Sequence, residues 1–360
     1  MQPRKIAFIE LHGTHEECIY SQLLFLKQGG HDTTFFYETQ SRERSERMNP
    51  GCHTLAFSVR GKKGLSYWRA LWALRNGIIK GGFDTVIFNT AHGNLVRDFV
   101  LLPFPGRIRF FGTMHGINKL SGSITQKIIS RRVCHYLLLN DYLKDNLKGM
   151  SYSPHLRFES FYAMYFPAFP EAAPLSKPAN ELWIGIPGQV EYKRRDYEGL
   201  VRAFAALKDK PPYRFLLLGN DCHRDGNGPE LRKLIERHGL GTYFRFTGYL
   251  DYPEFHNLLR HCDVIAPLIH PGNDGFEKYL IYQISGAYNL AFAYKKPLII
   301  LKDFERYEDF RENAVFYELG KLPEVLEKLP QALAAKADIL YRHPKWNFEY
   351  QCRRYLRFID

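Results

Sequence analysis

Short apolar runs alternate with amphipathic stretches along most of the chain. Residues 5–11 (KIAFIEL) and 33–37 (TTFFY) are strand-like, and between them residues 16–28 carry apolar side chains at helical spacing before Gly29-Gly30. This order predicts a strand, a helix and a second strand. Similar apolar runs, separated by helical segments such as residues 123–133, recur at 83–90, 108–116, 135–140 and 159–165. The first half therefore predicts an α/β domain with a parallel sheet.

A second series of the same kind follows a proline-rich connection at residues 167–181 (PAFPEAAPLSKPANE). Strands are predicted at 182–188, 213–221, 243–250, 263–270 and 295–304, with helices at 196–207, 229–239 and 252–262. The last stretch, residues 343–360, also reads as a helix. We predict two Rossmann-like parallel-sheet domains, at 1–170 and 182–340, with the helix at 343–360 packing back on the first.

Composition and charge narrow the class of protein. The 360 residues are 45% hydrophobic, enough for two packed cores, and the apolar run at the N-terminus is too short for a signal sequence. We expect a cytoplasmic protein. The net charge of +12 favours an anionic partner, but no nucleic-acid-binding signature is present, so we expect no nucleic acid. The six cysteines form no metal-like cluster with the histidines, so no metal is expected.

Glycine follows several predicted strands of the second half at once. Gly188, Gly219 and Gly248 each stand at a strand end, and Ser285-Gly286 precedes a short helix. Ligands of open parallel sheets bind at the carboxyl ends of the strands, where glycine lets backbone N–H groups approach a phosphate. We expect Ser285 to cap the helix through its hydroxyl, and the helix N-terminus to seat a diphosphate. Ordinary turns and a plain helix cap are the structural alternatives.

The order of these pieces resembles a known enzyme family. The segments PGQVEYKRRDYEGLVRAFAAL, FLLLGND, FTGYLDYPEFHNLLRHCDVIAPL and SGAYNLAFAYKKPLII, within residues 183–325, resemble the second half of GT-B glycosyltransferases of the retaining family-4-like kind (glycosyl transferases group 1). The resemblance implies two Rossmann-like domains facing each other across a cleft, the second binding a nucleoside diphosphate sugar and the first an acceptor. It implies no cofactor and no metal requirement.

The resemblance implies a donor site in the second domain. Lys193 matches the family lysine that contacts the donor diphosphate, with Arg194 or Arg195 in support, because Gln189 replaces the usual arginine. The paired family glutamates fall at Tyr282 and Leu290, so both carboxylates are missing. Asp274 and Glu277 lie upstream in a polar loop as candidate substitutes. The donor residues expected are Gly13, Gly188, Lys193, Arg194, Gly219, Gly248, Tyr282, Ser285 and Gly286.

In the first domain the resemblance rests on the opening glycine turn and on GTMHG. His115 matches the family histidine near the transferred sugar and is the expected catalytic residue. Gly13 matches the loop that faces the donor phosphates. His12, Glu16 and His92 stand at strand ends as candidate acceptor contacts, and His15 borders the same loop.

Residues 60–82 form a basic amphipathic stretch with two tryptophans. Trp68 and Trp72 share a predicted helix face, flanked by Lys62, Lys63 and Arg69. Such a helix can lie on an anionic membrane, which would place the protein peripherally on the inner face. Packing of the apolar side on the sheet is the structural alternative.

Together these features lead to the hypothesis of a hexosyltransferase-like enzyme, with two alternatives. It would move a sugar from a nucleoside diphosphate sugar to a glycan or lipid-linked acceptor in cell-envelope polysaccharide synthesis, with retention implied by the family. One alternative is a non-catalytic nucleotide-sugar- or glycan-binding homologue, suggested by Tyr282 and Leu290. Another is a nucleotide-sugar epimerase built from the same two domains.

Overall fold

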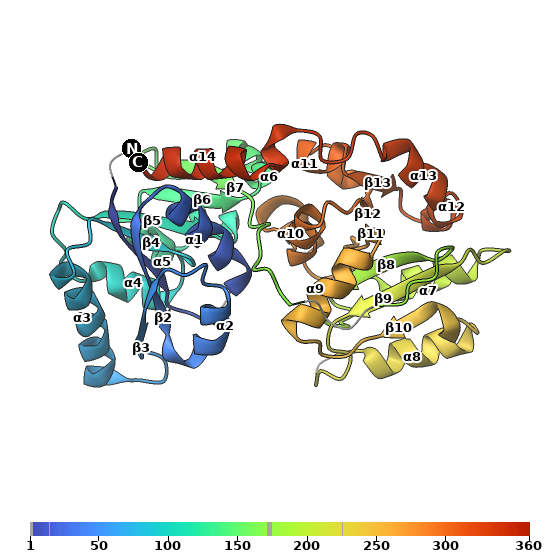
Figure 1. The fold of residues 1–360 in the computed structure, drawn as a ribbon, viewed down its shortest axis with the longest axis horizontal. Coiled ribbons are helices and arrows are strands. Elements are labelled where there is room, and N and C mark those ends of the chain that lie inside the picture. The colour runs from blue at the N-terminus through green and yellow to red at the C-terminus, as the bar shows by residue number, and fades with distance from the viewer. Residues whose placement is uncertain (1–2, 14, 171–174, 225) are drawn as a thin grey trace. The chain divides into compact units, whose positions relative to one another are not determined.

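The computed structural model describes residues 3–13, 15–170, 175–224 and 226–360. The chain divides into two compact units (Figure 1). The first domain comprises Met1–Pro167, Tyr282–Ile284 and Lys345–Asp360, and the second comprises Ala168–Ile281 and Ser285–Pro344. Residues 171–174 of the proline-rich connection lie outside the described residues.

The first domain is built on a parallel sheet of seven strands among the described residues, in the order β3-β2-β1-β4-β5-β6-β7. Its central strands are almost entirely buried and apolar, as expected for a parallel sheet covered on both faces. The strands are β1 (Lys5–Glu10), β2 (Asp32–Glu38), β3 (His53–Phe57), β4 (Thr85–Phe88), β5 (Arg109–Met114), β6 (His135–Leu139) and β7 (Arg157–Phe161).

Helices connect these strands. From β1 the sheet extends through β2 to β3 in one direction and through β4, β5 and β6 to β7 in the other. The helices are α1 (Ile19–Gln28), α2 (Arg42–Arg47), α3 (Gly64–Lys80), α4 (Asn94–Leu101), α5 (Ile124–Ile129), α6 (Asp141–Asn146) and α14 (Phe348–Ile359). Short 3-10 turns include η1 (Glu16–Cys18), η3 (Ile117–Leu120) and η4 (Leu147–Gly149).

The C-terminal helix α14 belongs to the first domain. Its Tyr355 is fully buried, and the Tyr355 and Phe348 rings lie 5.4 and 5.5 Å from the Phe25 ring of α1. Arg354 forms ion pairs of 2.7 Å with Asp141 and 2.9 Å with Glu159. Figure 1 shows α14 in red running to the C-terminus beside the N-terminus.

The second domain holds a parallel sheet of six strands in its described part, in the order β10-β9-β8-β11-β12-β13. The strands are β8 (Leu182–Pro187), β9 (Tyr213–Leu218), β10 (Phe244–Phe246), β11 (Val264–Ile265), β12 (Leu298–Leu301) and β13 (Ala314–Tyr317). The helices are α7 (Tyr197–Ala205), α8 (Gly228–Arg237), α9 (Tyr252–His261), α10 (Gly286–Ala293), α11 (Glu308–Arg311), α12 (Leu322–Glu327) and α13 (Leu329–Lys336), with a π-helical turn η6 (Lys278–Tyr282).

The predicted fold class is confirmed by these two parallel sheets with their helices. The structure adds two edge strands, β3 and β13, that the apolar pattern does not predict. All carboxyl ends of the strands in one parallel sheet lie at the same edge, which is where ligands bind in such sheets. The glycine turns of the second domain and the histidines of the first both follow strands, so each set gathers at such an edge.

Candidate functional site

A cavity of about 190 Å³ lies within the second domain at the start of α10. Among the residues that the structure describes, its lining carries two guanidinium side chains and no carboxylate, so it is suited to an anion. The lining residues are Gly188, Gln189, Arg194, Arg195, Ile269, Tyr279, Ser285 and Gly286. Four residues of the expected donor site, Gly188, Arg194, Ser285 and Gly286, are thus brought together.

The turn after β8 depends on glycine. Gly188 has a φ of +116°, and a Cβ there would collide with the guanidinium of Arg195. A Cβ on Gly219, which follows the neighbouring strand β9, would collide with the carbonyl of Gly188. Both glycines therefore allow backbone and guanidinium to pack more closely than any side chain would permit.

Arg195 is held in place by its surroundings. Its Nη1 donates to the carbonyl of Pro267 at 2.5 Å. The next residue, Asp196, caps α7 by accepting from the N–H of Gly199 at 2.8 Å, and its own N–H donates to the Leu268 carbonyl at 2.9 Å. These bonds fix the guanidinium itself and the backbone of the next residue, so the charge is preorganised at the cavity wall.

Arg194 and Lys193 share one buried carboxylate. Glu191, whose side chain is 3% exposed, lies 2.9 Å from Arg194 Nε and 3.8 Å from Lys193 Nζ. Arg194 lines the cavity, whereas Lys193 is not among the lining residues and its side chain is 53% exposed. The structure thus places Lys193 beside the cavity, and Arg194 and Arg195 at its wall.

The Ser-Gly turn opens α10 as expected, but one detail of the prediction is wrong. Ser285 occupies the N-cap position with extended backbone, yet its side chain makes no capping hydrogen bond. Its carbonyl instead accepts from the N–H of Tyr288 at 2.9 Å. A Cβ on Gly286 would meet nothing within 4 Å, so the first turn of the helix borders open space. Ser285 and Gly286 line the anion-suited cavity, so the hydroxyl and the first N–H groups of the helix are potential donors there.

Gly248 lies outside the cavity lining. It follows β10 with a φ of +67°, and its nearest neighbour for an added Cβ is Asp221 Oδ1 at 3.9 Å. Asp221 is buried and paired with Arg232 of α8. Because β10, β9 and β8 are neighbours in the sheet, Gly248, Gly219 and Gly188 stand at adjacent strand ends.

The two residues at the positions of the missing glutamates lie in different domains. Tyr282 belongs with Gln283 to the first domain, where Gly116 and Gln283 form an antiparallel bridge and Tyr142 Oη donates to the Gln283 carbonyl at 2.9 Å. Leu290 lies on α10 and is partly exposed. Asp274 and Glu277 are exposed. Neither carboxylate lines the cavity, so the structure offers no substitute for the missing pair among its lining residues.

In the first domain a buried carboxylate organises the loop after β1. Glu10 is fully buried, and its Oε1 accepts from the N–H groups of His12 at 2.6 Å and Gly13 at 3.0 Å. Its Oε2 accepts from Asn89 Nδ2 at 2.7 Å and Thr90 Oγ1 at 2.8 Å. Burial raises the pKa of Glu10 although all four of these donors favour the carboxylate. Glu10 therefore ties the loop after β1 to the end of β4.

Four histidines gather above this carboxylate. The His15 ring stacks on the His115 ring at 3.7 Å, and the His12 ring lies 6.0 Å from the His92 ring. The Nε2 of His115 donates to the carbonyl of Asn89 at 2.8 Å, and the Nε2 of His12 donates to the carbonyl of His92 at 2.9 Å. The structure thus brings together three expected residues, His12, His92 and His115, with His15.

His15 is the partly exposed member of the stack. His115 is 4% exposed and lies under the His15 ring, whereas the His15 side chain is 30% exposed. His15 has a φ of 59° and its Nδ1 contacts Glu17 Oε1 at 3.2 Å. Glu16 lies next to it, 3.4 Å from Arg44 Nη1. Any ligand that approaches the stack from solvent therefore meets His15 first.

The four imidazoles differ in how readily they take up a proton. Burial holds the pKa of His115 well below its usual range, lowers that of His12, and lowers that of His92 to about 3. Burial also opposes protonation of His15, but its contact with Glu17 and the charges of Glu17, Glu10 and Glu16 outweigh that effect, so the pKa of His15 is raised. A proton that arrives at this cluster is therefore held by His15.

Two residues that organise these sites were not singled out from the sequence for this role. Glu10 stands in a run of apolar residues, and a carboxylate at the end of a buried strand is a signal that it has buried partners. Arg195 was named only as support for Lys193. In the described residues, no group of three or more His, Cys, Asp or Glu side chains is arranged to hold a metal ion.

The depressed pKa values predict acid sensitivity. Because unfolded histidine takes up a proton near pH 6.5 and folded His92 only near pH 3, the stability that neutral His92 contributes is complete above pH 6.5 and is lost as the pH falls toward 3. At pH 5 this group should cost about 2 kcal/mol of unfolding free energy. In urea unfolding at pH 7 and pH 5, His92→Asn should lose less stability on acidification than the native chain. The exposed His53→Asn variant should lose as much stability between pH 7 and pH 5 as the native chain. An equal loss in His92→Asn would contradict a depressed pKa at His92.

Part of the second domain is similar to a known protein family. Residues 171–272 match the model of the family described as glycosyl transferases group 1. That segment holds Gly188, Lys193, Arg194, Arg195, Gly219 and Gly248. No curated protein matches this chain.

Solved structures match nearly the full length at low identity. Anabaena HepE in complex with UDP has a TM-score of 0.65 at 13% identity, over 99% of this chain and 96% of that one. Sucrose-phosphate synthase from Thermosynechococcus elongatus has a TM-score of 0.60 at 15% identity, over 100% and 95%. UDP-GlcNAc 2-epimerase from Neisseria meningitidis bound to UDP-GlcNAc has a TM-score of 0.63 at 14% identity, over 98% of each chain. The chain thus has the two-domain GT-B fold, and residues 171–272 of the second domain are similar to the glycosyl transferases group 1 family.

Proposed function

We propose that the protein is a glycosyltransferase whose second domain binds a nucleoside diphosphate sugar. The observation that carries the proposal is the cavity at the start of α10, where Arg194 and Arg195 meet the turns at Gly188 and Ser285-Gly286. Negative charge develops on the diphosphate as the glycosidic bond breaks, and preorganised cations and helix N–H groups stabilise it there. In this proposal the guanidinium groups supply the positive charge, and Lys193 adds to it from beside the cavity.

Uridine diphosphate is the first nucleotide to test. HepE was solved with UDP and the epimerase with UDP-GlcNAc, and both have the same fold as this chain. The likeness supports a nucleotide ligand of this class without selecting the sugar. We propose a glycan or lipid-linked acceptor of cell-envelope polysaccharide synthesis and transfer with retention of configuration.

The histidine cluster of the first domain is proposed to serve the transferred sugar or its acceptor. His15, the solvent-facing ring, can exchange a proton with a substrate hydroxyl through Nε2 while Glu17 holds Nδ1. His115 supports the ring from below and keeps its own proton on Nε2, bound to the Asn89 carbonyl. His12 and His92 fix the loop around this pair and stay neutral at physiological pH.

A second candidate function is binding without catalysis. It is favoured by Tyr282 and Leu290, which stand where the family resemblance expects glutamates. Such a protein would bind the nucleotide but neither transfer nor hydrolyse the sugar. An epimerase, the third candidate, would convert the nucleotide sugar in the absence of an acceptor, so product analysis separates all three functions.

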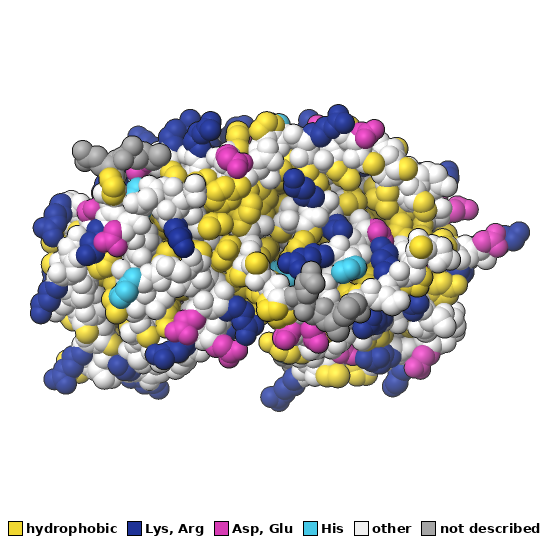
Figure 2. Space-filling view, in the orientation of Figure 1, with side chains coloured by type: hydrophobic (Ala, Val, Ile, Leu, Met, Phe, Trp, Pro, Cys, Tyr) yellow, Lys and Arg dark blue, Asp and Glu magenta, His cyan; other side chains and the backbone are white. Residues whose placement is uncertain are grey.

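The helix α3 is proposed to contact an anionic membrane surface. Leu71, Leu74 and Ile78 are buried against the first domain. On its outer side Leu65, Trp68 and Trp72 are 66%, 40% and 40% exposed, with Lys62, Lys63 and Arg69 also exposed around them. Figure 2 shows basic side chains in dark blue along the left edge, where α3 lies in Figure 1. This pattern is typical of interfacial helices. Among the described residues, no helix is long and apolar enough to span a membrane.

Binding of UDP should depend on Arg194. Arg194→Ala removes a cation from the cavity wall, so the thermal shift caused by UDP should shrink and the Kd rise about tenfold. Lys193→Ala should weaken binding less, because that side chain lies beside the cavity. Arg237→Ala, an exposed arginine at the end of α8, is the matched control and should bind as the native chain does. Equal UDP affinity in Arg194→Ala and Arg237→Ala would contradict the proposed site.

Substitution of His15 should lower the rate of transfer without changing the affinity for the nucleotide. His15→Gln should lower the rate of sugar transfer or donor hydrolysis about 10²-fold, since it removes the group that exchanges the proton, while UDP binding stays unchanged. Release of UDP in a coupled assay gives the rate, and His53→Gln is the exposed control. A full rate in His15→Gln would remove this residue from the mechanism.

Membrane binding should require both tryptophans and anionic lipid. Trp68→Ser with Trp72→Ser should lower the fraction that sediments with phosphatidylglycerol-containing vesicles about tenfold, because it removes the apolar anchors. Pure phosphatidylcholine vesicles should bind little native protein. Exposed Tyr249→Ser in the second domain is the matched control. Equal sedimentation of native and doubly substituted protein would rule out this surface.

A further inference from the structure

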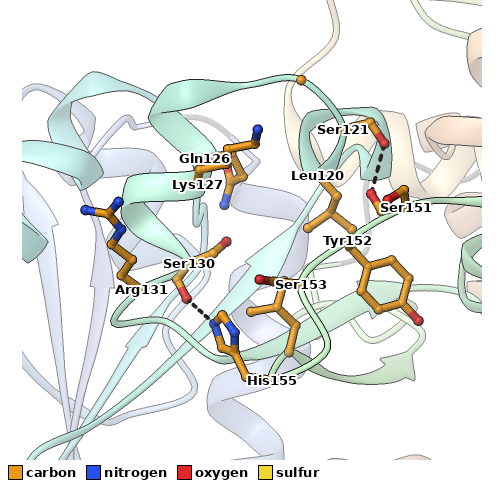
Figure 3. A pocket seen from close by; sticks show the side chains of 12 residues that line it. Leu120, Ser121, Gln126, Lys127, Ser130, Arg131, Ser151, Tyr152, Ser153 and His155 are labelled. Carbon is orange, nitrogen blue, oxygen red and sulfur yellow. Dashed lines mark hydrogen bonds between the residues drawn. The ribbon is translucent and has the colours of Figure 1, made fainter.

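A second cavity, of about 550 Å³, lies within the first domain away from the histidine cluster. Its walls are the end of η3, the helix α5 and the loop of residues 151–156 that leads into β7 (Figure 3). None of the four clustered histidines lines it. Its volume is within the range of small-molecule sites, about 300–1,000 Å³. Neither the donor cavity nor the proposed transfer makes use of it.

The floor of this cavity is buried and the rim is polar and positively charged. Leu120, Leu156, Gln126 and Ser130 are 7%, 5%, 2% and 6% exposed and form the floor. The rim carries the exposed cations Lys127 and Arg131, one helical turn apart, together with exposed hydroxyl side chains. No aspartate or glutamate is among the lining residues, and neither cation has an ion-pair partner among the residues that the structure describes.

The floor is tied firmly to the sheet. Tyr136 of β6 shares its hydroxyl with Ser130 Oγ at 2.8 Å and accepts from Gln126 Nε2 at 2.9 Å. Gln126 Nε2 also donates to the carbonyl of Ala91 at 3.2 Å, and His155 Nε2 donates to the carbonyl of Ser130 at 3.0 Å, as Figure 3 shows for the latter. These bonds hold the cavity open without a ligand and reduce the entropy that binding must overcome.

Gln126 leaves one polar atom of the floor without a partner. Its Oε1 is buried and accepts no hydrogen bond within the described chain. An unpaired buried acceptor costs about 1–3 kcal/mol, which a hydroxyl donor held in the floor would relieve. A sugar offers such hydroxyls.

The rim also offers an aromatic face. Tyr152 is 37% exposed, and its ring packs edge-on against Phe158 of β7 at 4.9 Å. Figure 3 shows Tyr152 and Ser151 on one side and Arg131 on the opposite side. An amphipathic ring beside hydroxyl groups suits the apolar face and polar edge of a pyranose.

From these features the geometry points to a second saccharide site in the first domain, which binds a sugar unit carrying a phosphate or carboxylate group. The hydroxyl side chains of the rim and the Tyr152 ring hold the sugar, with Gln126 below them, and Lys127 and Arg131 hold the charge. The ligand can be a free sugar phosphate or an acidic unit within a longer glycan, which share this chemistry. The site is separate from the donor cavity and does not depend on transfer taking place.

Calorimetric titration of the full chain tests this site. Glucose 6-phosphate and glucuronate should bind. Glucose lacks the charged group and inorganic phosphate lacks the sugar ring, so each should bind at least about tenfold more weakly. A glucuronic acid trisaccharide that binds tighter than glucose 6-phosphate would identify a glycan as the source, and the reverse order would identify a free sugar phosphate. Inorganic phosphate binding as tightly as glucose 6-phosphate would overturn the saccharide site.

Variants on the exposed rim separate this site from the donor site. Lys127→Gln with Arg131→Gln should weaken glucose 6-phosphate binding about tenfold, and Ser153→Asp should do the same by repulsion, with UDP affinity unchanged in both. Lys148→Gln with Arg107→Gln, exposed cations outside the lining, are the matched control. Unchanged sugar phosphate affinity in the rim variants would overturn the proposal. A protein that binds no UDP but still binds glucose 6-phosphate through this rim would leave the site standing while the proposed function fails.

Discussion

The guanidinium of Arg195 occupies the space that a side chain at residue 188 would fill. The stronger constraint is the backbone, because residue 188 has a φ of +116°, which L residues with a side chain rarely adopt, and this turn bends the chain after β8 around the charge. Gly219 lies against the same turn, while Pro267 and Asp196 fix the arginine from the other side. The cavity at α10, and with it the case for a diphosphate ligand, depends on this close packing.

In the first domain the buried carboxyl group of Glu10 fixes the surrounding loops, as Arg195 does in the second. Glu10 is a buried acceptor that holds two backbone N–H groups of one loop and two side chains of the next. A buried carboxylate is costly unless it is hydrogen-bonded, and four donors offset part of that cost. The loop that results positions the partly exposed His15 over the buried His115, and His15 is the member of the cluster with the raised pKa. Each domain thus builds its site by fixing loops around one titratable side chain, Arg195 in the second domain and Glu10 in the first.

Much of the fold could be predicted from the sequence because buried parallel strands are continuous apolar runs. KIAFIEL, YRFLLL and PLIIL are of this kind, and they form β1, β9 and β12. The edge strand β3 could not be predicted in this way, since His53–Phe57 is largely exposed and shows no apolar run. The edge strand β13 has only four residues and pairs with β12 alone, so its run in the sequence is too short to indicate a strand.

The candidate site was predicted less completely, and the reason is local geometry. The glycine turn after a strand and the Ser-Gly start of a helix are visible in the sequence, so Gly188 and Ser285-Gly286 were found. Spacing does not tell which of three consecutive cations lines a cavity. Arg195 lines it because of its bond to Pro267, a residue 72 positions away. The Ser285 hydroxyl makes no cap because the backbone already bonds Ser285 to Tyr288. Glu10 was missed because its partners come from a different strand end.

The central claim is that the second domain recognises a diphosphate through Arg194, Arg195 and the start of α10. Calorimetric titration with UDP and with uridine, under identical salt, tests it most directly because the two ligands differ only in the diphosphate. Binding of UDP about 100-fold tighter than uridine, with the difference shrinking as salt is raised, is the result that two guanidinium contacts predict. Equal affinities for UDP and uridine, or no binding of either, would contradict a diphosphate seat at this cavity.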